Sequence, residues 1–285
     1  MRVKELVAFI KEREAIRLKK EAGKPRPWTK DLILGKYRFC NIHREDDRVT
    51  KELRQISFID GQQWHDPDEW FWWIVARLFN NPDTMRALAG LILPWKPERV
   101  RKILHVRKAK SLKNFNAAYI VSTNGVAMDK VDYLVERVLN PLWAARKLMR
   151  PSNHTLEEYR RELMQYDGLG SFIAAQVVAD LKYMEPLKSA PDWWTFAASG
   201  PGSRRGMNRV MGREVNAPQP EAVWRENLAV LSMGVHSFSR GGHVVLPIRM
   251  HNQDLQNCLC EFDKYERARL GEGTPKQIYK ERSND

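Results

Sequence analysis

The sequence contains little cysteine. Only Cys40, Cys258 and Cys260 occur among its 285 residues, too few for the disulfide framework of a small secreted protein. Three thiols also cannot supply the four ligands of an iron–sulfur cluster. Cys258 and Cys260 make a poor metal site with His251, because residues two apart on a helix face different ways. We therefore expect a protein of the reducing cytoplasm.

Long apolar runs are missing as well. No stretch approaches the roughly 20 apolar residues that a membrane-spanning helix needs, and the start of the chain lacks the apolar segment of a signal peptide. The sequence also shows no internal repeat and no low-complexity linker. Its 285 residues suffice for one large domain or two closely packed lobes. We expect no membrane partner.

Acidic residues are outnumbered by basic ones. The chain has 48 Lys and Arg residues against 35 Asp and Glu residues, which gives a formal net charge of +13. A charge of this sign favours a polyanionic partner, namely DNA, RNA or an acidic membrane surface. The alternative that composition leaves open is a basic surface that is merely solvated.

Apolar residues recur at helical spacing along most of the chain. Residues 66–80, for example, begin with Asp66 and Pro67 and continue through an almost wholly apolar body, which predicts a buried helix. We expect an all-α fold with few or no strands. Its helices should occupy about residues 2–22, 47–56, 66–80, 83–92, 97–108, 129–149, 155–166, 173–181, 207–212, 221–233 and 251–270.

A glycine-containing turn at residues 167–170 separates two of these helices. The helix before it opens with a Thr-x-x-Glu capping box at Thr155 and Glu158. Gly168 and Gly170 allow the backbone to come close to a phosphate, and the amides that open the next helix point at it. Asp192 follows Gly170 by 22 residues. The alternative is a plain connection between two helices, with a solvated aspartate.

Two other segments carry more polar groups than a hydrophobic core would contain. In residues 37–54 the arginines suit phosphate or pyrophosphate, because a guanidinium binds such groups with two donors; a surface network of ion pairs is the alternative. The helix at 251–270 places carboxylates, amides, a phenol and an ammonium on adjoining stripes. The polar residues of the two segments include Arg38, Asn41, Arg44, Asp47, Arg48, Thr50, Lys51, Arg54, Asp254, Asn257, Glu261, Lys264 and Tyr265.

The turn and Asp192 resemble the helix-hairpin-helix signature of the DNA glycosylase superfamily. The resemblance implies that Gly168, Gly170 and Ser171 grip the DNA backbone and that Asp192 enters the base pocket. A basic loop follows, and its Arg204 and Arg205 are further candidates for DNA contact.

Three blocks together resemble the alpha-glutamyl/putrescinyl thymine pyrophosphorylase family and the related helical domain of hydroxymethyluracil DNA kinases. The blocks are residues 38–44 with Asp47 and Thr50, the hairpin with Asp192, and residues 259–265 followed by 271–273. The resemblance covers most of residues 37–280. It implies a phage-encoded transferase of the host cytoplasm that replaces the pyrophosphate of a pyrophosphorylated hydroxymethyluracil in DNA by an amine. The chain lacks the G-x-x-x-x-G-K-[ST] phosphate loop that a kinase needs.

The resemblance and the residue types together suggest roles for the site residues. The partners would be double-stranded DNA carrying a modified thymine, a small amine donor (an amino acid or polyamine) and other phage modification enzymes. The target base would be flipped into a pocket. No cofactor is assigned, and a divalent metal is left open. The catalytic candidates are Asp192, Glu261 and Lys264, and the candidates for binding pyrophosphate or substrate are Arg38, Asn41, Arg44, Asp47, Thr50 and Tyr265.

The same resemblance divides the chain into expected segments of one glycosylase-like unit with two packed helical lobes. These segments are a basic N-terminal helix and linker (1–36), a first lobe (37–150), the hairpin and aspartate loop (151–215) and C-terminal helices that close the active site (216–285). Two other functions stay open: a DNA repair glycosylase, and a non-catalytic DNA-binding partner of a hydroxymethyluracil DNA kinase.

Overall fold

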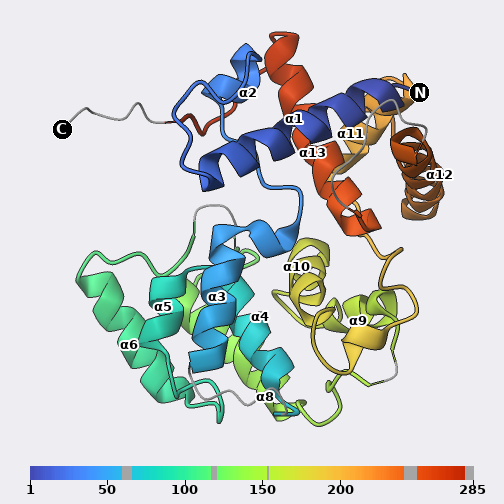
Figure 1. Cartoon of the computed structure of the whole chain (residues 1–285). Helices are drawn as coiled ribbons and strands as arrows, with labels where there is room; N and C mark the ends of the chain where they lie inside the picture. The colour runs from blue at the N-terminus through green and yellow to red at the C-terminus, as the bar shows by residue number, and fades with distance from the viewer. Residues whose placement is uncertain (60–65, 117–120, 153, 241–248, 280–285) are drawn as a thin grey trace. The chain divides into compact units, whose positions relative to one another are not determined.

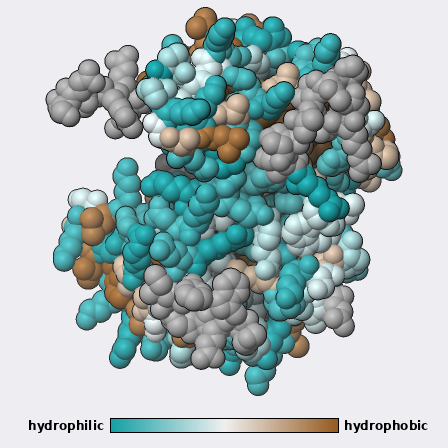
Figure 2. Space-filling model, viewed as in Figure 1, coloured by the Kyte–Doolittle hydropathy of each residue, from teal (hydrophilic) through white to brown (hydrophobic). Residues whose placement is uncertain are grey.

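The computed structural model describes residues 1–59, 66–116, 121–152, 154–240 and 249–279 (Figure 1). The expected all-α fold is confirmed for these residues. Their only β pairing is an isolated antiparallel bridge between Tyr37 and Ile278. Of the described helices, none combines the length and the apolar character needed to cross a membrane. The surface shown in Figure 2 is mostly hydrophilic, with small scattered hydrophobic groups.

The chain forms two compact units. One is the continuous segment Arg48–Phe196, and the other combines the two ends of the chain, Met1–Asp47 and Ala197–Asp285. The segments expected from the sequence are linear stretches, whereas the second of these units is not, because its N-terminal helix packs with helices from the last third of the chain. We call Arg48–Phe196 the central unit and the other the terminal unit.

The central unit is organised around α4, which is buried on all sides as expected. Helix α4 begins at Glu69 rather than at the expected Asp66, because the Asp66 carboxylate accepts the Asp68 backbone N–H at 2.8 Å and forms a preceding turn. The helices of this unit are α3 (Arg48–Ile59), α4 (Glu69–Phe79), α5 (Pro82–Ala87), α6 (Pro97–Ala109), α7 (Lys130–Tyr133), η2 (Leu134–Leu139), α8 (Asn140–Ala144), α9 (Leu156–Leu163), α10 (Ser171–Leu181) and η3 (Leu187–Ser189).

The helix expected over residues 129–149 is interrupted. Helix α7 leads into η2, a π-helical segment, which leads into α8, and the helical run ends at Ala144. Pro141 accounts for the irregularity, because it has no N–H to donate to the carbonyl one turn earlier. The wider π turn accommodates that lost hydrogen bond.

A buried ion pair joins three helices of the central unit. Arg77 on α4 donates to both carboxylate oxygens of Asp180 on α10, and both side chains are almost completely buried. The same guanidinium donates to Asn80 Oδ1 at 2.9 Å and to the Thr50 hydroxyl on α3 at 2.8 Å. Four hydrogen bonds therefore compensate the cost of burying this charge pair.

The terminal unit depends on an unusually close approach between two helices. A Cβ atom on Gly206 of α11 would lie 2.0 Å from the backbone oxygen of Leu259 on α13, and one on Gly202 would lie 2.5 Å from Cys260 Sγ. Only glycine permits this contact at Gly206. The helices of this unit are α1 (Val3–Glu21), α2 (Leu32–Lys36), η1 (Arg44–Asp46), α11 (Pro201–Met211), α12 (Glu221–Arg240) and α13 (Asn252–Arg269).

Candidate functional site

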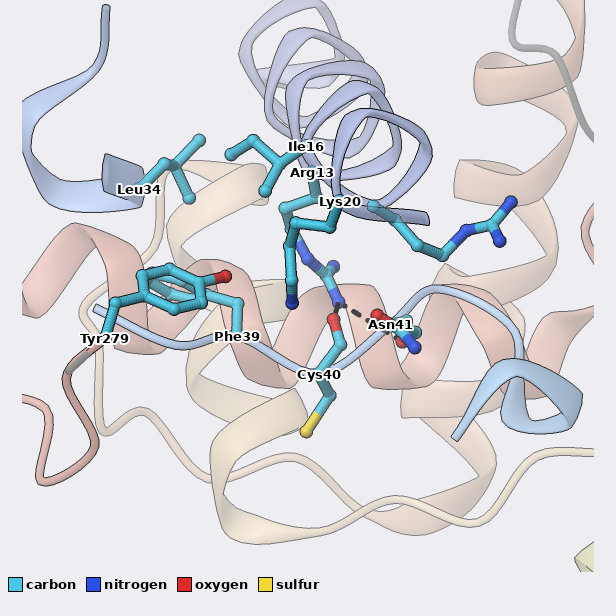
Figure 3. Close-up of a pocket in the computed structure, with 9 residues that line it drawn as sticks. Arg13, Ile16, Lys20, Leu34, Phe39, Cys40, Asn41 and Tyr279 are labelled. Carbon is cyan, nitrogen blue, oxygen red and sulfur yellow. Dashed lines mark hydrogen bonds between the residues drawn. The ribbon is translucent and has the colours of Figure 1, made fainter. Parts of the chain in front are cut away.

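A pocket in the terminal unit gathers several basic residues (Figure 3). Its walls come from α1, α2 and the segment 37–43 that precedes η1, with Tyr279 near the end of the described chain. Arg13 and Lys20 extend from α1 towards that segment in Figure 3. The lining residues are Arg13, Ile16, Arg17, Lys20, Leu34, Phe39, Cys40, Asn41 and Tyr279.

Arg13 is the buried cation of this pocket, with 5% of its surface exposed. Its guanidinium donates to the backbone oxygen of Cys40 and, at 3.4 Å, to that of Asn41, and so holds the segment against α1. Arg13 Nη1 donates to Cys258 Sγ at 3.5 Å, whereas Arg13 Nε is buried and has no hydrogen-bond partner among the described residues. Arg13 and Lys20 both line the pocket, and cations that line a pocket favour an anion there.

The positive charges around the pocket crowd one another. Burial and the nearby charge of Arg38 lower the pKa of Lys20 below its usual value. The Lys20 ammonium also lies over the ring of Tyr279, 5.2 Å from its centre. An anion in the pocket would relieve this repulsion between cations. Arg17, by contrast, is neutralised by Glu14 and Glu21 on its own helix.

Glu261 on α13 connects the pocket to the second polar segment. Its carboxylate accepts the Cys40 backbone N–H at 3.0 Å and the Lys264 ammonium at 2.8 Å. The Lys264 ammonium also lies 4.5 Å from the centre of the Phe39 ring. The negative charge of Glu261 is the main cause that raises the pKa of the Cys40 thiol to about 12, since Cys40 itself is exposed. This cysteine therefore stays protonated at neutral pH and is no thiolate nucleophile.

Two further contacts hold the segment 37–43 in place, one from α13 and one to η1. The Asn257 side-chain amide donates to the backbone oxygen of Asn41 at 2.8 Å, while the Asn41 amide donates to the backbone oxygen of Asp46 at 2.7 Å. Tyr265 points instead at α2, where its hydroxyl donates to Asp31 at 2.7 Å. Burial and Asp31 raise the pKa of Tyr265 above its usual value, so this phenol is a neutral donor.

The other proposed pyrophosphate residues lie in both units. Arg38 is exposed on the segment that lines the pocket, and its backbone N–H donates to Gln277 at 2.9 Å. Arg44 opens η1 and Asp47 follows its end, so both belong to the terminal unit. Thr50 belongs to the central unit, where it is buried and accepts the hydrogen bond from Arg77.

A cluster with metal-ligand chemistry lies on the same segment. His43, Glu45 and Asp254 each offer a ligand atom, and these atoms lie within 4.8 Å of one another. His43 Nδ1 lies 2.8 Å from Asp254 Oδ2, and His251 Nδ1 lies 3.3 Å from the same oxygen. Burial alone would lower the pKa of His43, but its hydrogen bond to Asp254 and the negative charges around it raise that pKa.

The hairpin lies in the central unit, between α9 and α10. The capping box that Thr155 and Glu158 form at the start of α9 is confirmed. Gly168 has φ +76°, and a Cβ atom there would lie 2.7 Å from Val138. Gly170 is the N-cap of α10, and the Ser171 hydroxyl accepts a hydrogen bond from Arg160 at 3.2 Å. The turn therefore needs glycine at position 168 for two independent reasons.

Asp192 contacts the first helix of the hairpin. Its two carboxylate oxygens accept the backbone N–H groups of Leu156 and Glu157 at 2.7 and 3.1 Å, at the start of α9.

The two arginines proposed for DNA contact lie in the terminal unit. Arg204 donates to Ser199, to the backbone oxygen of Gln219 and to Glu221. Arg205 pairs with the buried Asp263 at 2.9 Å. Like Asp192, both arginines make these contacts within their own unit.

Sequence reasoning missed Arg13, Asp31 and the grouping of His43 and Glu45 with Asp254. Arg13 follows Ile10 by three residues and therefore continues the apolar face of α1, which is an unusual place for a cation. That position was the available signal. Asp31 and the His43 cluster gave none, because their partners lie more than 200 residues away in the chain.

Comparison with protein families matches residues 1–274 to the family described as "5-hmdU DNA kinase, helical domain". Among curated proteins, the chain is similar to the 5-hmdU DNA kinase of Bacillus phage SP10, with 24% identity over 210 residues. The matched residues make up 66% of this chain and 32% of the kinase, so the chain spans about a third of the length of this relative. It matches no solved structure.

Proposed function

The chain belongs to the family of 5-hmdU DNA kinase helical domains, and we propose that it is a transferase of thymine hypermodification. In this proposal it replaces the pyrophosphate of a pyrophosphorylated hydroxymethyluracil in DNA by an amine. The terminal unit holds the reacting groups, and the hairpin of the central unit binds the DNA backbone.

The observation that carries the proposal is the junction of a cationic pocket with a carboxylate–ammonium pair. Arg13 and Lys20 line the pocket, and Cys40 on its wall is hydrogen-bonded to Glu261. The departing group of the proposed reaction is a polyanion, and the incoming group arrives as a cation. Cys40 therefore contacts both the cationic pocket, which would bind the departing polyanion, and the Glu261 carboxylate, which would bind the incoming cation.

The proposed reaction exchanges one bond for another at the methylene carbon on the base. The ammonium donor first gives a proton to Glu261 and becomes a free amine. The nitrogen lone pair then forms the new C–N bond, while the C–O bond breaks and its electrons leave with the bridging oxygen of pyrophosphate. Arg13, Lys20 and Arg38 would stabilise the negative charge that develops on that oxygen.

The remaining candidates have supporting roles in this proposal. Lys264 donates to Glu261 at 2.8 Å and would adjust its basicity as the donor ammonium arrives. Asn41, Arg44 and Asp47 would position the phosphates or the base. Asp192 would act as a positioning residue for the hairpin, because its carboxylate holds the start of α9.

DNA binding in this proposal rests on charge and on the hairpin. The net charge of +13 favours a polyanion. The turn at Gly168 and Gly170 exposes the first backbone amides of α10, whose helix dipole favours a phosphate. The target base would leave the stack to reach a pocket.

A second candidate function is that of a non-catalytic DNA-binding module. The observation in its favour is that this chain corresponds to only about a third of a relative named as a kinase. A module of this kind would present DNA to a separate active site. It would need the hairpin but not the Glu261 carboxylate.

The deciding experiment is a reaction with defined DNA. Duplex DNA that carries pyrophosphorylated hydroxymethyluracil is incubated with the protein and a panel of amino acids and polyamines. Its nucleosides are then analysed by mass spectrometry. The transferase predicts a nucleoside whose mass reports the incorporated amine, together with free pyrophosphate. Binding of the DNA without any new nucleoside favours the module, and abasic sites would mean a glycosylase.

A further inference from the structure

We infer that the terminal unit contains a binding site for one divalent transition-metal cation, formed by His43, Glu45 and Asp254. This site is independent of the proposed function, because it is argued from the ligand atoms alone. Residues His43 and Glu45 come from the segment that includes η1, and Asp254 comes from the first turn of α13.

The residue types at this place suit such a metal. One imidazole and two carboxylates are ligands that Mn²⁺ and Zn²⁺ both accept, whereas Ca²⁺ and Mg²⁺ prefer oxygen alone. Their ligand atoms lie within 4.8 Å of one another. Two atoms bound at about 2.1 Å on opposite sides of a cation are at most about 4.2 Å apart. The cluster therefore needs a contraction of only several tenths of an ångström.

Unsatisfied atoms distinguish this cluster from an ordinary histidine–aspartate pair. His43 Nε2 and Glu45 Oε2 are both buried, and neither has a hydrogen-bond partner among the described residues. Asp254 is almost completely buried, with 2% of its surface exposed. Buried polar atoms in proteins are usually paired. A cation bound by these three side chains would neutralise the two carboxylates.

The surroundings also support the site. The His251 backbone N–H donates to Asp254 Oδ2 at 3.3 Å, and His251 Nδ1 accepts the Asp254 backbone N–H at 3.3 Å. A ligand carboxylate held by a second polar group is typical of metal sites, because the outer contact fixes its orientation. Asp254 precedes Glu261 by two turns of α13, or about 10 Å along the helix. The cation would thus add positive charge near the cationic pocket.

The central unit offers a matched control. His105, Asp129 and Asp132 also combine one imidazole with two carboxylates, and their ligand atoms lie within the same 4.8 Å. Here the groups are already satisfied, since His105 Nε2 pairs with Asp132 at 2.8 Å and the Lys108 ammonium pairs with Asp129 at 2.5 Å. His105 is also 40% exposed at its side chain. We expect this cluster to bind no metal tightly.

The test is calorimetric titration of the full chain with Mn²⁺ and with Zn²⁺ after removal of metals by a chelator, without DNA. We expect one equivalent to bind. His43→Gln or Glu45→Gln should each weaken binding by at least about tenfold, and His105→Gln should leave it unchanged. Circular dichroism checks that each variant is folded. Only the metal affinity of a folded variant is compared with that of the unmodified chain.

Absence of binding by the unmodified chain would overturn the proposal, as would binding that survives both substitutions. A Co²⁺ derivative provides a second measurement on the unmodified chain, since its visible absorption reports a nitrogen and oxygen ligand set. The transferase assay is separate from these titrations. A failure of metal binding therefore leaves the proposed function standing, and the reverse also holds.

Discussion

The two units use their buried charges differently. In the central unit, Arg77 donates to Asp180, Asn80 and Thr50, and these hydrogen bonds join three helices. In the terminal unit, Arg13 keeps a buried donor without a partner beside a pocket, and Glu261 faces the same segment. A charge whose bonds are all used inside the protein stabilises the fold, whereas a charge with a spare donor can bind a ligand. We therefore propose a structural role for the first arrangement and the chemical role of the proposed function for the second.

The largest effect that would test this difference is expected for Asp180→Asn. The substitution leaves Arg77 buried without its carboxylate, and breaking such a pair costs about 3–5 kcal/mol of unfolding free energy. Urea denaturation measures the loss. The control is Glu52→Gln, which removes partly exposed pairs with Arg86 and Arg48 and should cost less than about 1 kcal/mol. Equal losses of unfolding free energy for both variants would mean that the Arg77–Asp180 network stabilises the fold no more than a surface ion pair does.

Glu261→Gln should affect turnover rather than folding. The amide keeps the size of the side chain but cannot accept the proton of the amine donor, and loss of a general base costs about 100-fold or more in rate. The rate of amine incorporation into DNA measures the effect. Glu214→Gln, an exposed carboxylate of the same unit, is the control and should be silent. Incorporation that survives Glu261→Gln unchanged would place the chemistry elsewhere.

Gly206→Ala should loosen the terminal unit by a smaller amount. Its new methyl group would meet the backbone of Leu259 and force α11 away from α13, a kind of overpacking that costs about 1–3 kcal/mol. Gly234→Ala on α12 is the control, because the nearest atoms there lie 3.9 Å away. That variant should gain up to about 1 kcal/mol from helix propensity. Urea denaturation measures the unfolding free energy of both variants. A Gly206→Ala variant as stable as the unmodified chain would contradict the prediction.

Most of the helices and the hairpin could be predicted from sequence because their signals are local. The capping box at Thr155 and the apolar body of α4 each occupy a single stretch of chain. The interrupted helix near Pro141 was harder, since periodicity continues through it. The two polar segments around Cys40 and Glu261 were recognised separately, by residue type and by resemblance.

Their contact was not predictable, and neither was the division into units. The Cys40–Glu261 hydrogen bond spans 221 residues, and no spacing rule reaches that far. The same limit hid the grouping of His43 with Asp254. Long-range polar contacts of this kind depend on how helices pack, which here includes the close approach allowed by Gly206.

The smallest effect is expected for Asp192→Asn, which tests whether a charge of the central unit serves stability alone. Its carboxylate accepts two backbone N–H groups at the start of α9, and a negative charge at a helix N-terminus contributes about 0.3–1 kcal/mol. Asparagine keeps one acceptor oxygen but loses the charge. We expect a loss of that size in urea denaturation and an amine-incorporation rate close to that of the unmodified chain. A fall in rate as deep as that of Glu261→Gln, with stability unchanged, would instead make Asp192 a participant in the chemistry and bring the central unit into the active site.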